Sequence, residues 1–115
     1  MEIAGTAKNP YRAKISAVGG YVPPGVLTNV DLETMVATND QWIVERTGIR
    51  ERHVCAPEEA TSDLAFHAAT RALEQAKVDP KELDLIVMGT VTPDMPWPAS
   101  AALLQGRLGN KKAFA

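Results

Sequence analysis

Residues Leu83–Val91 read LDLIVMGTV, and this stretch indicates the fold class of the chain. From Leu85 to Met88 every side chain is apolar. A short, continuous apolar run is typical of a strand that is buried on both faces of a sheet. The stretch therefore predicts a strand over 85–91 within a layered α/β fold.

The segment before this strand predicts a long helix that Thr61 or Ser62 caps and that ends near Lys77 at Val78-Asp79-Pro80. Because alanine side chains are short, whatever packs on the apolar face of this helix is expected to approach it closely. That face recurs at helical spacing and comprises Leu64, Ala65, Ala68, Ala69, Ala72, Leu73 and Ala76.

The segment after the strand contains a proline-rich loop, TPDMPWP, and then a helix expected over 99–108 that Gly109 ends. From Lys111 the sequence predicts the approach to a further strand. A sheet that lacks its next strand leaves an exposed edge, and exposed edges promote aggregation. We therefore expect the chain to be a piece of a longer protein.

The N-terminal part is expected to begin with a loose leader, residues 1–12. Residues 13–22, AKISAVGGYV, predict a strand, and the turn at Tyr21–Gly25 follows it. Extended residues are also expected over 49–54. With the helices described here and below, the order of elements predicts helices that cover a sheet.

Two short helices are expected between these extended segments. The sequences TNVD, from Thr28, and TNDQ, from Thr38, each place an acid or amide three residues after a threonine, a pattern typical of helix caps. The helices are predicted over about 31–37 and 40–47, with Gly48 as the stop of the second.

The composition is that of a soluble globular protein. The chain has 115 residues, 45% of them hydrophobic and 23% charged, and its net charge is −2. This mild acidity argues against a nucleic-acid binder, and a single cysteine excludes an internal disulfide. The stretch Leu83–Val91 is too short to cross a membrane. We expect a cytoplasmic protein with no nucleic-acid or membrane partner.

The segment TNDQWIVERTGIRER, from Thr38 to Arg52, holds the main candidate site. Trp42 and Arg46 are four residues apart and share a helix face. One interpretation is a structural cation–π pair. The other is a clamp in which the indole stacks on an aromatic ring and the guanidinium reaches a phosphate. Thr38 would add a hydroxyl and nearby backbone donors.

The other reactive side chains of this region are expected to have no catalytic role. Arg50 and Arg52 have Glu45 and Glu51 as available ion-pair partners. A Cys55–His53 pair is conceivable in a strand, but no third member or oxyanion hole accompanies it, so we interpret Cys55 as non-catalytic.

His67 lies off the alanine face and is expected at the surface, and no metal-ligand spacing is present. Trp97, between two prolines, is either an interface or pocket residue or an anchor packed on its own core.

These residues also carry a family resemblance. The blocks DQWIVERTGIRERH, AATRALEQA, LDLIVMGT and PASAA occur in the order found in β-ketoacyl-acyl carrier protein synthase III, which the chain resembles over nearly all of its length. The resemblance implies a thiolase-like fold of helices packed on a mixed β-sheet. Residues 13–115 would be the N-terminal part of its first half.

The resemblance also implies a reaction. Members of this family are homodimers that take a short acyl-coenzyme A primer, hold no permanently bound cofactor, and transfer the acyl group to a cysteine. Malonyl-acyl carrier protein then loses carbon dioxide and attacks the thioester, which initiates fatty-acid synthesis. Two alternatives remain open: a related condensing paralogue that uses other acyl thioesters, and a short non-catalytic subunit that binds coenzyme A or a synthase.

The resemblance assigns roles to residues by their motif positions. Trp42 would stack on the adenine of coenzyme A, Arg46 would contact its phosphates, and Thr38 would line the same entrance. Trp97 matches an aromatic position that crosses the dimer interface to shape the partner's acyl pocket, and its size favours a small acyl group. The Cys-His-Asn triad would lie beyond Ala115, so the chain alone is expected to be inactive.

Overall fold

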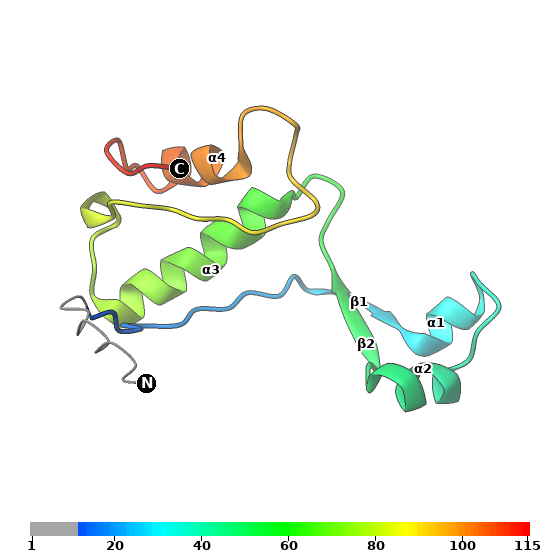
Figure 1. The fold of residues 1–115 in the computed structure, drawn as a ribbon. Helices are drawn as coiled ribbons and strands as arrows, with labels where there is room; N and C mark the ends of the chain where they lie inside the picture. The colour runs from blue at the N-terminus through cyan, green and yellow to red at the C-terminus, as the bar shows by residue number, and fades with distance from the viewer. Residues whose placement is uncertain (1–11) are drawn as a thin grey trace, which may run out of the picture.

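The structure, a computed structural model, describes residues 12–115 and arranges them in two clusters of elements joined by irregular segments (Figure 1). Of the expected leader, residues 1–12, all but Arg12 lie outside the described residues. One cluster contains β1 (Gly25–Thr28), α1 (Asn29–Glu33), α2 (Asp40–Thr47) and β2 (Glu51–Val54), and the other contains α3 (Thr61–Ala76), the short 3-10 helix η1 (Pro80–Glu82) and α4 (Ser100–Arg107).

The first cluster is built on a two-stranded antiparallel sheet. β1 pairs with β2 in a register that places Gly25 opposite Val54 and Thr28 opposite Glu51. The extended segment expected over 49–54 is thus confirmed in β2. The strand expected over 13–22 is wrong: the first strand begins at Gly25, and no described segment forms a ladder with residues 13–22.

Residues 13–22 lie along α3 instead of joining a sheet (Figure 1). The Val18 N–H donates to Gln75 Oε1 over 3.3 Å, and the Gly20 carbonyl accepts from Arg71 Nη1 over 2.7 Å. A Cβ on Gly19 would lie 2.3 Å from the Ala68 carbonyl oxygen, closer than any side chain tolerates. The expected close approach to the alanine face is therefore confirmed at Gly19.

α1 begins with the cap that its sequence predicts but is shorter than expected. Thr28 Oγ1 accepts from the Asp31 N–H over 3.2 Å, and Asp31 Oδ2 accepts from the Thr28 N–H over 2.9 Å, which forms a capping box. The predicted bounds, 31–37, are wrong, because the helix starts at Asn29 and ends at Glu33. The hydroxyl of Thr34 bonds the Asp31 carbonyl over 2.7 Å and competes with the helical pattern there.

The remaining helices follow their sequence signals closely. α2 has the predicted bounds, and Gly48 ends it in the left-handed region at φ 72°. α3 matches the predicted long helix, although Ala60 rather than Thr61 or Ser62 occupies the cap position. α4 lies one residue inside the predicted range at each end, and Gly109 follows it at φ 68°.

The strand predicted over 85–91 is not formed as a ladder. Leu85 makes one parallel bridge with Phe114, while Val87 is 83% exposed and Val91 is 98% exposed. The apolar run predicts burial on two faces, but among residues 12–115 its only sheet partner is Phe114. After Lys111 the chain runs parallel to the Leu85 segment at this one bridge, as an approach to a strand requires, but no further strand forms within residues 12–115.

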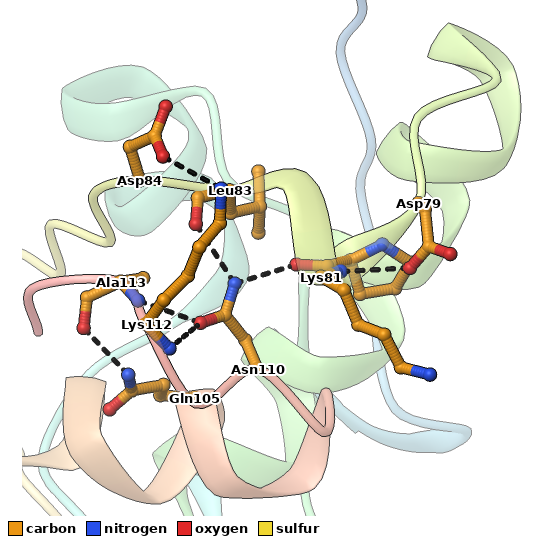
Figure 2. Close-up of polar contacts among 9 residues, drawn as sticks. Asp79, Lys81, Leu83, Asp84, Gln105, Asn110, Lys112 and Ala113 are labelled. Atoms are coloured by element: carbon orange, nitrogen blue, oxygen red, sulfur yellow. Dashed lines mark hydrogen bonds and ion pairs between the residues drawn. The ribbon is translucent and has the colours of Figure 1, made fainter.

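Asn110 bonds both of the segments that form this bridge (Figure 2). Its side chain is buried, at 3% exposed. Nδ2 donates to the carbonyls of Pro80 and Leu83 over 2.8 and 2.9 Å, and Oδ1 accepts from the N–H groups of Lys112 and Ala113 over 2.9 and 2.7 Å. The amide thus fixes the start of the Leu85 segment beside the segment that leads to Phe114.

Replacing Asn110 with alanine is expected to lower the free energy of unfolding by about 2–4 kcal/mol, because buried donors and acceptors lose their partners. Urea denaturation at pH 7 measures the change. Lys112→Ala is the control: its ion pair with Asp84 spans 2.9 Å between exposed side chains, so its loss should change stability by only about 0.5 kcal/mol. Equal effects of the two changes would contradict this role of Asn110.

The structure is open, and little of it forms a core. Its radius of gyration is 19.9 Å, whereas a compact domain of this length would have about 13 Å. Among the described residues the buried hydrophobic side chains are Ile43, Ala101, Leu104 and Ala113. In the same residues no helix has the length and apolar character needed to span a bilayer.

Candidate functional site

α2 presents Trp42 and Arg46 on its outer face. Asn39 Oδ1 accepts from the Trp42 N–H over 2.8 Å and so caps the helix. Ile43 is 6% exposed and occupies the inner face, whereas Trp42 is 52% exposed. The Arg46 guanidinium carbon lies 5.3 Å from the centroid of the Trp42 ring. The structure therefore brings the indole and the guanidinium together at the surface, as both interpretations of the pair require.

Thr38 precedes the helix and is half-buried. Asn39, and not Thr38, supplies the capping oxygen. Among the described residues the Thr38 hydroxyl has no hydrogen-bond partner within this chain. The hydroxyl therefore lies near the positive end of α2 without an internal role there.

The arginines near α2 are not paired with the glutamates that the sequence offers. Within residues 12–115 neither Arg50 nor Arg52, for which this pairing was expected, makes an ion pair, and Arg46 makes none either. Glu45 instead accepts from Gln41 Nε2 over 2.8 Å. The pairing expected for Arg50 and Arg52 is therefore wrong, and the exposed Arg46 carries its charge toward solvent.

Arg52 has an internal partner that sequence reasoning missed. Its Nη1 donates to Asn29 Oδ1 over 2.7 Å. Asn29 is 1% exposed and begins α1. In the sequence, Asn29 is the second residue of a Thr-Asn dipeptide, a position that also suits a helix cap, and nothing else indicated its bond to Arg52. The contact depends on residues that lie 23 positions apart in the chain.

Cys55 follows β2 and is half-buried beside a hollow of about 410 Å³. Nδ1 of His53 lies 2.7 Å from the Pro23 carbonyl oxygen, so that nitrogen is a donor engaged away from the thiol. No hydrogen bond joins Cys55 to a base within the described part of the chain. Within residues 12–115 the Cys55 thiol is therefore not paired with a general base of the kind that activates a nucleophile.

His67 is exposed on α3, where its ring centroid lies 4.6 Å from that of Tyr21. Across residues 12–115 no group of three or more histidine, cysteine, aspartate or glutamate side chains is placed to hold a metal ion.

Trp97 projects from its loop and is 83% exposed. This exposure contradicts the interpretation of Trp97 as an anchor packed on this chain's own core.

The loop that carries Trp97 is held in place by Asp94. Asp94 Oδ1 accepts from the Ser62 N–H and from Ser100 Oγ over 3.0 and 2.8 Å, and Oδ2 accepts from Ser62 Oγ over 2.6 Å. One carboxylate therefore joins the loop to the first turns of α3 and α4.

These contacts make part of the stability depend on pH. Desolvation opposes the charged form of Asp94, but the hydrogen bonds from Ser62 and Ser100 outweigh it and lower the pKa of this carboxyl. Because the folded pKa lies below the unfolded value of about 3.9, the stabilisation is present above that pH and is lost as the pH falls through the folded pKa.

The urea midpoint of the parent chain is expected to fall between pH 5 and pH 3. In Asp94→Asn this fall should be smaller, because the contribution of one carboxyl group to the acid dependence is removed. Denaturation curves across that range measure the difference. An unchanged acid dependence in the variant would contradict the assigned role of Asp94.

No family model matches the chain. Its sequence is 61% identical over 99 residues to the β-ketoacyl-[acyl-carrier-protein] synthase III of Desulfitobacterium hafniense, a match that covers 86% of this chain and 30% of that relative. Among solved structures, the 3-oxoacyl-[acyl-carrier-protein] synthase III from Aquifex aeolicus has a TM-score of 0.84 at 46% identity over 89% of this chain and 33% of that one.

A further solved structure is a priming β-ketosynthase from a polyketide biosynthetic pathway. It matches with a TM-score of 0.82 at 35% identity, over 88% of this chain and 30% of that chain. The chain thus spans about a third of the length of these relatives and is similar to their N-terminal part. The predicted thiolase-like α/β class is confirmed as the fold of which this chain forms a part.

Proposed function

We propose that this chain, which is similar to the N-terminal part of β-ketoacyl-[acyl-carrier-protein] synthase III, supplies the coenzyme A entrance of a condensing enzyme that initiates fatty-acid synthesis. The observation that carries the proposal is the pair on α2: an exposed indole with a guanidinium 5.3 Å from its centroid. The sequence identity to the synthases supports it.

The pair suits the chemistry of coenzyme A. The free face of the Trp42 ring can stack on the adenine, a contact that needs no particular base edge. The guanidinium of Arg46 offers a planar fork to the phosphates. Thr38 adds a hydroxyl at the helix start. No permanently bound cofactor is part of this proposal.

The proposed reaction takes place on residues outside this chain. An acyl group passes from the sulfur of coenzyme A to a cysteine thiolate, which releases the coenzyme thiol. Malonyl-acyl carrier protein then loses carbon dioxide, and the carbanion equivalent attacks the carbonyl carbon of the thioester. The carbon–sulfur bond to the enzyme breaks, which gives a β-ketoacyl-carrier protein and frees the cysteine thiolate. The Cys-His-Asn triad is proposed to lie beyond Ala115, and the protein is proposed to work as a cytoplasmic homodimer.

Trp97 is proposed to cross the dimer interface and shape the partner's acyl pocket. Its 83% exposure in the single chain leaves the indole available for this role. The size of the indole favours a short acyl primer.

A related condensing enzyme with another acyl thioester is the second candidate, and the 35% identity to the priming β-ketosynthase favours it over unrelated functions. A non-catalytic subunit that binds coenzyme A is the third. The reading frame after Ala115 separates them: a strand followed by a small-residue turn with cysteine supports an enzyme, and a stop codon supports the subunit.

Calorimetric titration of the chain with coenzyme A tests the proposal directly. We expect saturable binding that weakens as salt is raised, because phosphate contacts with Arg46 are screened. The absence of binding at low salt by a folded chain would contradict the proposed function.

A further inference from the structure

Asn29 is the most deeply buried polar residue of the described chain, and it lies behind α2. Its side chain is 1% exposed, although it belongs to a surface helix of only five residues. Every polar atom of the amide has a partner: Nδ2 donates to Asp40 Oδ1 and to the Ile49 carbonyl, each over 2.8 Å, and Oδ1 accepts from Arg52 Nη1 over 2.7 Å.

The two partners of Nδ2 lie at opposite ends of α2. Asp40 is the first residue of the helix, and Ile49 follows Gly48, the residue that ends it. The backbone of Asn29 adds a bond from its N–H to the Arg50 carbonyl over 3.2 Å. One buried side chain therefore holds the helix that carries Trp42 and Arg46 at its beginning and at its end.

We propose that Asn29 is a positioning residue for the coenzyme site, because it sets the position of α2 and hence of the Trp42–Arg46 pair relative to β2. This inference rests on the proposed function of that pair. Ile43 is the one buried side chain of α2, so apolar packing alone constrains the helix weakly. The amide supplies the directional contacts that packing lacks.

Only a planar amide meets these requirements. The position needs two donors that diverge toward Asp40 and Ile49 and one acceptor for Arg52, and asparagine provides all three. An aspartate would have the same shape and would still accept from Arg52. It would lose both donors and place a second carboxylate 2.8 Å from the Asp40 oxygen.

Asn29→Asp tests the inference by calorimetry with coenzyme A. We expect the Kd to rise by about tenfold or more, since small displacements of binding groups are costly. The second change, Asp40→Asn, added to Asn29→Asp restores a donor and an acceptor that face each other at that contact. It should recover part of the affinity, because the Ile49 carbonyl still lacks its donor. A role in stability alone would not predict this recovery of the Kd in the folded protein.

Asn110→Ala is the matched control. Asn110 is also a buried, fully bonded asparagine, but it joins the η1 and C-terminal segments instead of α2. Its replacement should lower stability yet leave the Kd within about twofold, because distant sites act independently.

A Kd for Asn29→Asp within about twofold of the parent would overturn the inference while the proposed function stands. A parent chain that does not bind coenzyme A would overturn both. If circular dichroism shows that Asn29→Asp is unfolded, Asp40→Ala decides the question: it removes one bond to the amide, and an unchanged Kd in that variant overturns the inference.

Discussion

The 115-residue chain is expected to form no β-ketoacyl product from acetyl-coenzyme A and malonyl-acyl carrier protein. No hydrogen bond joins its one cysteine, Cys55, to a base among the described residues. Condensation needs an activated thiolate to accept the acyl group. Mass spectrometry of the carrier protein after incubation measures the product.

The complete synthase III of Desulfitobacterium hafniense serves as the positive control in the same assay. Product formed by the chain alone, and lost in Cys55→Ser, would contradict the account, because it would make Cys55 the nucleophile. Product that persists in Cys55→Ser would indicate a contaminating synthase.

Trp42→Ala is expected to weaken coenzyme A binding by about 1–3 kcal/mol, a factor of roughly 5 to 150 in Kd, because the adenine loses its stacking surface. Trp42 is 52% exposed and Ile43 carries the inner face of α2, so the change should leave the fold intact. Calorimetry with coenzyme A measures the effect.

Phe114→Ala is the matched control for Trp42→Ala. Phe114 is an aromatic side chain that is 80% exposed, and it belongs to the C-terminal segment beside α4, away from α2 (Figure 1). Its removal should leave coenzyme A affinity unchanged. Equal losses in the two variants would show that Trp42 acts only through general packing.

Local signals predicted α2, α3 and α4 well, but not the bounds of α1. α2 was predicted with its observed bounds because its start and stop are encoded in adjacent residues: Asn39 caps the first turn and Gly48 adopts the left-handed conformation that ends the helix. The spacing of Trp42 and Arg46 on that helix also predicted their contact, because residues four apart share one face.

The strands were predicted poorly because their hydrogen bonds are not local. The apolar run after Leu85 has the composition of a buried strand, but its ladder in the described chain is a single bridge to Phe114. Residues 13–22 likewise pack on α3 without a sheet partner. Composition indicates what a segment can bury, whereas pairing depends on which other strands are present.

The polar networks were not predictable from the sequence. Asn29 was interpreted with its neighbour Thr28 as a cap signal, yet its amide bonds residues up to 23 positions away. Asp94 occupies a proline-rich loop and bonds Ser62, 32 positions earlier. The bonded residues in each pair lie too far apart in the sequence for helical or strand periodicity to relate them. Sequence patterns therefore do not predict these contacts.

The indole N–H signals in a nitrogen–proton correlation spectrum test the central claim, that α2 binds coenzyme A, most directly. The chain contains two tryptophans, so two indole signals are expected, and Trp42→Phe assigns them. On addition of coenzyme A we predict that the Trp42 signal shifts in a saturable manner while the Trp97 signal stays in place. A Trp42 signal that does not move at saturating coenzyme A would contradict the account.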